Sequence, residues 1–399
     1  MTPRVLQVCP FDIPDQPSAG GQIRIDAIAK AYREAGYSVD RTCVVTRRRD
    51  ARRPMDLIMP WLDRVRRKHL GKPGNLGQIR QHWAAQASQR LHKQLAARLE
   101  HTYTIVHVEH PWDVALICAM RGHPMLARAR IVYSAHNIEH ELFESVTREQ
   151  GHWNRAAQQL AQEIRQIEEA AAAAADITWA VSLADAEKLT PFARQCVLAP
   201  NGCRELPTHA PLSLFSDLRG RYALFIGTNY APNINGFLSM VGNDLSFLPS
   251  GTSIHTIGTC AEALKQHAPY QPWMGAGRIR HHGKVSTALL DSALLNAGVI
   301  LLPILSGGGT NLKTAEALAS GQPVLGTTKA FRGFEVWLRA PSVHQADQPD
   351  VFRDNLVKLL LTFSTAQPAP RRQELTWSTA LRPAMEETLR NTLNSTSSP

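Results

Sequence analysis

The sequence has no continuous apolar run of about 18 residues, the length that a membrane-spanning helix requires. It has no signal-peptide core at its N-terminus, where residues 5–9 already have the pattern of a short buried strand. Its six cysteines are widely spaced and form no Cys-x-x-Cys pair, which argues against a zinc site or a disulfide framework. From these absences we expect a cytoplasmic protein whose thiols are buried and reduced.

Two familiar phosphate-binding patterns are also missing, the Gly-Lys-Ser/Thr ending of a Walker loop and the GxGxxG dinucleotide fingerprint. The chain has instead three consecutive glycines at 307–309, after the apolar strand pattern of residues 299–302. Thr310 or Asn311 can cap a helix that follows, and Gly321 ends it. Unpaired N–H groups and the helix dipole make such a helix start attractive to anions. The stretch therefore predicts a phosphate-type ligand, with tight strand-to-helix packing as the alternative.

The remaining sequence has an ordinary globular composition, with 44% apolar and 20% charged residues over 399 positions. This length favours two domains, each large enough for its own core. Strand and helix patterns alternate along both halves, which predicts two Rossmann-like α/β domains that face a cleft. Residues 5–9, a Gly20-Gly21 turn, a helix over 22–35 and a strand over 37–45 form the first such unit.

Histidines and carboxylates follow two predicted strands of the first half. Glu109 and His110 follow the strand at 105–108, and His136 follows the strand at 131–135, with Glu139 soon after. The carboxyl edge of a parallel sheet is where α/β proteins bind ligands, so we select His136 as the functional candidate. Glu109, His110 and Glu139 are secondary candidates, and the other histidines are assigned to the background, including His107, His123, His140, His152, His281 and His282.

The glycine-rich stretch resembles the C-terminal signature of retaining GT-B glycosyltransferases of family 4. The strand end at His136-Asn137, the Pro-Asn-Gly sequence at 200–202 and the segment 225–236 resemble further family motifs in the same order. The resemblance implies a nucleoside diphosphate sugar as donor and Glu316 as the ligand of its ribose. A first family glutamate would fall at Gly308 and is absent, as in a subgroup with a triple-glycine loop.

The resemblance also implies which residues hold the donor. His136 would touch the donor sugar, and Val285 would lie near the nucleotide base. The family's diphosphate-binding arginine and lysine are replaced here by Thr228 and Asn233, which leaves Lys284 and Lys313 as the available cations. The predicted catalytic residue is His136, and the predicted donor-binding residues are Gly20, Gly21, Gly309, Thr310, Asn311, Leu312, Lys313, Glu316, Lys284, Val285 and Asn233.

The domain boundaries follow from the loop composition around Pro207 and Pro211 and from the resemblance. We predict an N-terminal acceptor-side domain over residues 1–205 and a linker over 206–219. A nucleotide-sugar-binding domain over 220–375 would follow. Residues 376–399 would form a helix that crosses back to the N-terminal domain, and a polar tail.

The net charge of +10 is concentrated in residues 41–100, which hold fifteen Lys or Arg against four Asp or Glu. Nucleic acid is one partner for such a patch, but no aromatic interleaving or nucleic-acid motif accompanies it. An anionic membrane surface is the better candidate, because lipid-linked acceptors are found there, and Trp61 lies beside the basic cluster. A solvated basic face is the alternative.

The resemblance therefore implies a metal-independent, retaining glycosyltransferase that needs no cofactor beyond its nucleotide-sugar co-substrate. Its acceptor would be a glycan or a lipid-linked sugar, as in the synthesis of bacterial cell-surface polysaccharides and glycoconjugates. Backbone amides and cations would replace a metal at the departing diphosphate, and domain closure would bring His136 to the sugar. Two alternatives stay open, a sugar-nucleotide epimerase on the same fold and a non-catalytic relative that binds glycans or partners.

Overall fold

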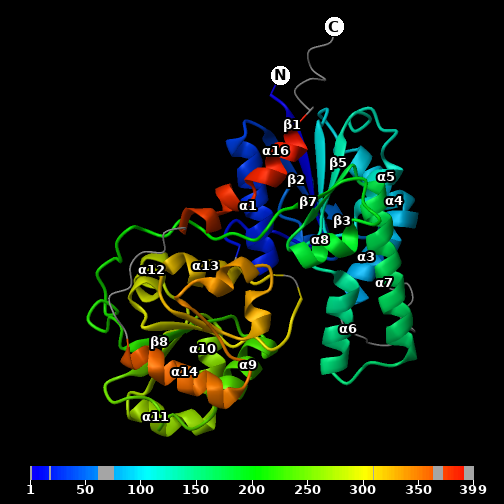
Figure 1. Ribbon diagram of the computed structural model, residues 1–399. Coiled ribbons are helices and arrows are strands. Elements are labelled where there is room, and N and C mark those ends of the chain that lie inside the picture. Colours follow the sequence, from blue (N-terminus) through cyan, green and yellow to red (C-terminus); the bar gives the residue numbers. More distant parts are fainter. Residues whose placement is uncertain (1, 18, 62–75, 309, 363–371, 391–399) are drawn as a thin grey trace. The chain divides into compact units, whose positions relative to one another are not determined.

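The computed structural model describes all residues except 1, 18, 62–75, 309, 363–371 and 391–399. The chain forms two compact units, of which the first comprises residues 1–200 and 380–399 and the second residues 201–379 (Figure 1). Each unit contains a parallel sheet flanked by helices. The predicted pair of Rossmann-like α/β domains is therefore confirmed.

The sheet of the first unit has the strand order β3-β2-β1-β4-β5-β6-β7, and all its pairs are parallel. Its central strands are buried along their length, as expected of a parallel sheet covered on both faces. The order places the carboxyl ends of β1, β4 and β5 side by side. The strands are β1 (Arg4–Cys9), β2 (Ser38–Val45), β3 (Leu57–Ile58), β4 (Ile105–Glu109), β5 (Arg130–Ser134), β6 (Ile177–Ala180) and β7 (Cys196–Leu198).

Helices cover both faces of this sheet. Leu6 of β1 packs into one apolar core, whereas Cys9 of the same strand packs with Ile25 on the opposite face. Residues 76–96 form two helices, because Ser88 separates them and caps the second with its hydroxyl. The helices are α1 (Gly20–Glu34), α3 (Leu76–Ala87), α4 (Gln89–Ala96), α5 (Val114–Ala119), α6 (Glu139–Glu149), α7 (Arg155–Ala174) and α8 (Leu183–Leu189), with a 3₁₀ turn at Arg48–Asp50.

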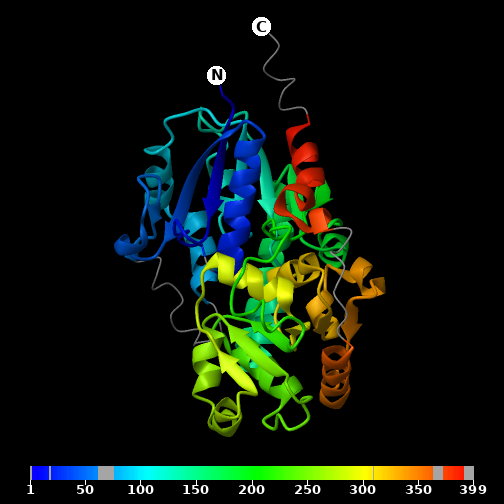
Figure 2. The ribbon, with the colours of Figure 1, turned by 90° about the vertical axis from the view of Figure 1, so that its left-hand side faces the viewer.

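The C-terminal segment belongs to the first unit from Ala380 onward. Its helix α16 (Arg382–Leu389) packs at β7 (Figures 1 and 2). The indole N–H of Trp179 donates to Thr388 Oγ1 at 2.9 Å, and the guanidinium of Arg130 donates to the Thr388 carbonyl at 3.0 Å. The predicted return of the C-terminal helix to the N-terminal domain is thus confirmed. The helix is interrupted, however, because α15 (Trp377–Ala380) ends before α16 begins.

The sheet of the second unit has the order β10-β9-β8-β11-β12-β13 and is also parallel. Alternate residues of β8 enter different apolar cores, Phe225 on one face and Leu224 on the other. The strands are β8 (Tyr222–Ile226), β9 (Ser253–Ile257), β10 (Ile279–His281), β11 (Val299–Leu302), β12 (Val324–Gly326) and β13 (Val343–Gln345). The helices are α9 (Ala231–Val241), α10 (Cys260–Lys265), α11 (Gln271–Gly275), α12 (Thr287–Asn296), α13 (Leu312–Ser320) and α14 (Pro349–Leu361), with 3₁₀ turns at Ala268–Tyr270, Thr328–Phe331, Glu335–Arg339 and Arg372–Leu375.

Three further observations concern the predictions from composition. All six cysteines lie among the described residues and are free thiols, four of them buried. No helix in the described ranges combines the length and apolarity needed to cross a membrane. The segment predicted as a linker, residues 206–219, lies within the second unit. It is not a free linker, because Phe215 is fully buried there and its ring packs against Tyr222 and His255.

The chain passes between the units twice, and in the second unit these two passages are hydrogen-bonded to each other. The N–H of Cys203 donates to the Leu375 carbonyl at 2.7 Å, and the N–H of Trp377 donates to the Cys203 carbonyl at 3.0 Å. Gly202 lies where they approach most closely. A Cβ atom at Gly202 would be 2.8 Å from the backbone of Trp377, a distance that requires one passage to move.

We therefore expect Gly202→Ala to lower the stability of the second unit by about 1–3 kcal/mol, the usual cost of overpacking. The matched control is Gly275→Ala, because Gly275 lies in the same unit, has a helical backbone and has open space around its Cβ position. Thermal unfolding followed by circular dichroism compares the two variants. A melting temperature of Gly202→Ala equal to that of the control would show that the two passages are not in close contact.

Candidate functional site

In the first unit, the predicted site residues gather at the carboxyl edge of the sheet. Glu109 ends β4, His136 follows β5, and Gly20 and Gly21 open α1 after β1. A Cβ atom at Gly21 would lie 3.9 Å from Nδ1 of His136. The imidazole therefore faces bare backbone at the start of a helix, where N–H groups lack partners within the helix.

A buried carboxylate holds His136 in place. Nε2 of His136 lies 2.8 Å from Oε2 of Glu109, and the Glu109 side chain is completely buried. Burial lowers the pKa of His136 well below its usual value, and the nearby His110 and Arg24 lower it further. A neutral ring that donates its Nε2–H to a carboxylate keeps an unprotonated Nδ1. Among the described residues, no hydrogen bond reaches this Nδ1, which faces Gly21.

The amide of Gln7 contacts Glu109 directly, and two buried arginines, Arg41 and Arg24, lie nearby. The side-chain amide of Gln7 donates to Oε1 of Glu109 at 2.7 Å, and Nε of Arg41 donates to Oε1 of Gln7 at 2.8 Å. Arg24 of α1 is buried, and its guanidinium donates to the Ala199 carbonyl at 2.8 Å. Burial lowers the pKa of Arg24 to about 10, and the attraction of Glu109 opposes this shift. These contacts fix the carboxylate and balance its charge.

A second histidine–carboxylate pair lies beside the first. Nδ1 of His110 is 2.7 Å from Oε1 of Glu139, and the rings of His110 and His136 are 4.0 Å apart between centroids. His110 has a φ of +64°, which is uncommon for a residue with a side chain. Its buried Nε2 has no hydrogen-bond partner among the described residues. The backbone is thus held in an unfavourable conformation that places a second imidazole beside the first.

In the second unit, the glycine-rich turn leads from β11 into α13. Gly309 lies outside the described residues, and Gly307 has a φ of +114°, a conformation that favours glycine. The side-chain amide of Asn201 donates to the hydroxyl of Thr310 at 2.6 Å and to its carbonyl at 3.1 Å. The Pro-Asn-Gly motif and the glycine-rich turn, which are far apart in the sequence, are therefore in contact.

The start of α13 has the cap that the sequence predicted. Asn311 is the N-cap, and its Oδ1 accepts from the N–H of Lys313 at 3.2 Å, while Leu312 is the first helical residue. At the other end, Gly321 adopts the left-handed conformation that ends the helix. The capping side chain satisfies one N–H of the first turn and leaves the others for an anion.

A lysine lies at this helix start. Nζ of Lys313 donates to Oδ1 of Asn233 at 2.7 Å, and the Asn233 amide donates to the Thr228 hydroxyl at 3.1 Å. Burial lowers the pKa of Lys313 to about 8. Thr228 and Asn233 thus form a polar chain that orients Lys313. A cation at this place is available for a phosphate.

Glu316, one turn further along α13, is already paired. Nε of Arg204 lies 3.4 Å from Oε1 of Glu316, and the same guanidinium contacts Asp291. Burial raises the pKa of Glu316, and Arg204 opposes this shift. The side chain of Glu316 remains 24% exposed. The carboxylate can therefore accept hydrogen bonds from a ligand, but it shares its charge with Arg204.

The other predicted residues are less well placed for a common role. Lys284 is exposed and forms no ion pair with any described residue, and Val285 packs against an apolar core of the second unit. In the basic stretch, residues 62–75 lie outside the described part of the chain. Arg52 pairs with Asp12 at 3.3 Å, so part of this charge holds the loop after β1. Trp61 is 63% exposed.

Sequence reasoning missed some residues that complete these sites. Glu109, His110 and Glu139 were only secondary candidates, although a Glu-His pair at the end of one strand and a histidine at the end of the next are detectable signals. Arg24 and Arg204 carried no signal, because their acidic neighbours are distant in the sequence.

No group of three or more His, Cys, Asp or Glu side chains among the described residues is arranged to hold a metal ion.

Comparisons with known proteins identify a similar sequence family and similar folds. Residues 18–204 match the model of the glycosyltransferase family 4 domain. A solved sucrose-phosphate synthase from Thermosynechococcus elongatus is 16% identical, with a TM-score of 0.68, and the match covers 98% of this chain and all of that one. A trehalose-phosphate synthase (UDP-forming) from Burkholderia xenovorans, solved with glucose-6-phosphate, is 14% identical, with a TM-score of 0.63 and coverage of 96% and 100%.

A third solved structure, a putative UDP-N-acetylglucosamine 2-epimerase from Listeria monocytogenes, is 13% identical, with a TM-score of 0.57 and coverage of 99% and 98%. Among curated proteins, no sequence gives a significant match. At these identities the solved structures establish the fold, which is that of the GT-B glycosyltransferases.

The buried neutral state of His136 makes stability depend on pH. The pKa of His136 is depressed in the folded chain and about 6.5 in the unfolded chain, so between these values only the unfolded chain takes up the proton. The free energy of unfolding therefore falls as the pH is lowered below about 6.5. Replacing His136 by Asn removes this contribution, which we expect to reduce the decrease by up to about 1.4 kcal/mol per pH unit.

Urea unfolding between about pH 5 and pH 7.5 measures this slope. His101→Asn is the control, because His101 is an exposed histidine of the same unit. Equal slopes for His136→Asn and the wild-type protein would contradict the neutral, carboxylate-held state of His136.

Proposed function

We propose that this protein is a retaining glycosyltransferase that moves a sugar from a nucleoside diphosphate sugar to a glycan or lipid-linked acceptor. The proposal depends on the proximity of Gly21 and His136, which come from separate motifs and lie at one edge of the sheet. The family 4 match over residues 18–204, which includes both of them, supports it. The solved relatives have names that imply sugar-phosphate or nucleotide-sugar chemistry.

In this proposal the second unit binds the nucleotide. The N–H groups at the start of α13 and the ammonium of Lys313 bind the diphosphate, which needs positive partners as it leaves. A pKa of about 8 leaves Lys313 protonated in most molecules at neutral pH, and an approaching diphosphate raises that pKa further. Glu316 accepts hydrogen bonds from the ribose hydroxyls beside Arg204.

The first unit supplies the group that acts at the sugar. Unprotonated Nδ1 of His136 accepts a hydrogen bond from a sugar hydroxyl and orients the ring, while α1 presents its free N–H groups nearby. The acceptor hydroxyl forms its bond to the anomeric carbon as the bond to the diphosphate breaks. Its proton passes to the departing phosphate oxygen, so no protein carboxylate and no metal takes part in this step.

A second candidate, a sugar-nucleotide epimerase, is favoured by one observation. The Glu109–His136 pair and the adjacent Glu139–His110 pair are acid–base groups close to the proposed sugar position, and one solved relative carries an epimerase name. Incubating the nucleotide sugar without an acceptor separates the two functions. An epimerase changes the configuration of the sugar under these conditions, whereas the transferase leaves it unchanged.

Glu316→Ala should weaken donor binding about 10- to 100-fold, since a hydrogen bond to a charged group contributes about 1.5–3 kcal/mol. A thermal-shift screen of nucleoside diphosphates first identifies the base, and calorimetric titration then gives the dissociation constants. Asp354→Ala is the control, because Asp354 is an exposed acid on α14 of the same unit. Unchanged affinity in the Glu316 variant would remove this carboxylate from the donor site.

His136→Ala should lower kcat by about 100-fold or more, because groups positioned at the reacting sugar typically contribute factors of this size. Nucleotide affinity should stay within about threefold of the wild-type value, since the nucleotide is bound by the other unit. His101→Ala should retain both properties. Full turnover in the His136 variant would exclude it from the mechanism.

A further inference from the structure

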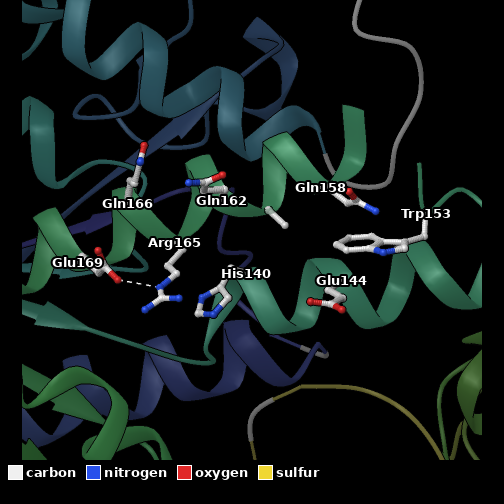
Figure 3. A pocket seen from close by; sticks show the side chains of 9 residues that line it. His140, Glu144, Trp153, Gln158, Gln162, Arg165, Gln166 and Glu169 are labelled. Carbon is white, nitrogen blue, oxygen red and sulfur yellow. Dashed lines mark hydrogen bonds and ion pairs between the residues drawn. The ribbon is translucent and has the colours of Figure 1, made fainter. Parts of the chain in front are cut away.

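An open groove with a volume of about 430 Å³ lies between α6 and α7 of the first unit (Figure 3). Both helices extend beyond the carboxyl edge of the sheet, the edge that carries His136 (Figure 1). No step of the proposed reaction uses this groove. Its lining includes His140, Glu144, Trp153, Gln158, Gln162 and Arg165.

One wall of the groove is a row of amide side chains. Gln158, Gln162 and Gln166 are spaced four residues apart on α7, so they lie along one face of the helix. All three are exposed, and their side-chain amides form no hydrogen bond with any described residue. Each amide offers two N–H donors and one acceptor oxygen. The row is therefore an unused set of neutral hydrogen-bonding groups.

An aromatic ring closes one end of the groove. Trp153 follows α6 and is half-buried against the apolar core under α7. The guanidinium of Arg148 lies 4.5 Å from the centre of the indole ring, which further restrains the ring. In Figure 3 the indole extends toward Gln158 and Glu144. A restrained ring with one accessible side can stack against the C–H face of a sugar.

The charged groups in and around the groove are paired with one another. Arg165 donates to Glu169 at 2.8 Å, Arg148 contacts Glu144 at 2.8 Å, and His140 contacts the buried Glu168 at 2.6 Å. A site whose charges are already paired has little net attraction for phosphates or for acidic lipids. Free amides, an aromatic ring and balanced charge together match a neutral, polyhydroxylated ligand.

We propose that this groove binds a neutral oligosaccharide, the growing glycan of the acceptor. The geometry supports continuity with the histidine site, because Glu139, which contacts His110, is followed directly by His140 of the groove. The N–H of His140 also donates to Glu168 at 3.1 Å, which fixes this first turn of α6 to α7. The lining residues on α7 run from Gln158 to Glu169, about 16 Å along the helix, so the groove is long enough for several sugar units beyond the reacting one.

The test uses the full-length protein and neutral oligosaccharides built from glucose, mannose, galactose or N-acetylglucosamine, from disaccharides to hexasaccharides. Calorimetric titration should show binding of at least one series, with affinity increasing with chain length. Gln162→Ala should weaken this binding by about tenfold, and Trp153→Ala by more. Gln159→Ala is the matched control, because Gln159 is exposed on α7 and does not line the groove.

Both glutamine variants alter exposed side chains and should fold normally, which circular dichroism checks, so the comparison does not depend on the half-buried Trp153. Equal affinities of Gln162→Ala and Gln159→Ala, or no binding of any series to the wild-type protein, would overturn the proposal. The proposed role of the groove rests on the proposed glycosyltransferase function, so nucleoside diphosphate binding is measured in parallel. A protein that binds nucleotide but no oligosaccharide contradicts the groove alone, whereas one that binds no nucleotide contradicts the proposed function.

Discussion

The first unit depends on one buried carboxylate. Glu109 is completely shielded from solvent, and burying its carboxyl group requires the hydrogen bonds that it forms with Gln7 and His136. This requirement has a chemical consequence. Burial, with His110 and Arg24 nearby, keeps the ring of His136 neutral, and its Nε2–H donates to Glu109, which leaves an unprotonated Nδ1 facing the bare backbone of Gly21. Stability and chemistry at this edge of the sheet therefore rest on the same contact.

The second unit has a different electrostatic feature, a set of groups at the start of α13 that can bind an anion. Its glycine-rich turn and capped helix provide N–H groups for an anion, and Thr228 and Asn233 lie where the sequence resemblance would place cations. The hydrogen bond from Lys313 to Asn233 shows how one lysine on the helix itself can take over part of that role. Arg204 is a second departure, because it contacts Glu316 and Asp291 together. Ribose recognition would then involve an ion pair instead of an isolated carboxylate.

The sequence was sufficient to predict the fold class, because continuous apolar strands, glycine turns and helix caps are local signals. The strand before His136 and the cap at Asn311 are examples. It was insufficient for features that depend on distant neighbours. The sequence places Phe215 in a loop, and its burial becomes evident only from the core that surrounds it in the structure. Arg204 has the sequence context of a surface residue, and only the structure shows its contact with Glu316. Gln158, Gln162 and Gln166 could not be recognised from the sequence as one wall of a groove, because the other wall is formed by α6.

The central claim is that burial and the neighbouring His110 and Arg24 keep His136 neutral while Glu109 binds its Nε2–H, so that Nδ1 can accept a hydrogen bond from a sugar hydroxyl. Nitrogen-15 NMR of the labelled histidines, assigned with a His136 variant, tests it most directly. The account predicts a neutral His136 ring protonated at Nε2 at neutral pH. It also predicts that the Nδ1 signal shifts when the nucleotide sugar is added and remains in place when the nucleoside diphosphate alone is added. A protonated imidazolium, or an Nδ1 signal indifferent to the sugar, would contradict the account.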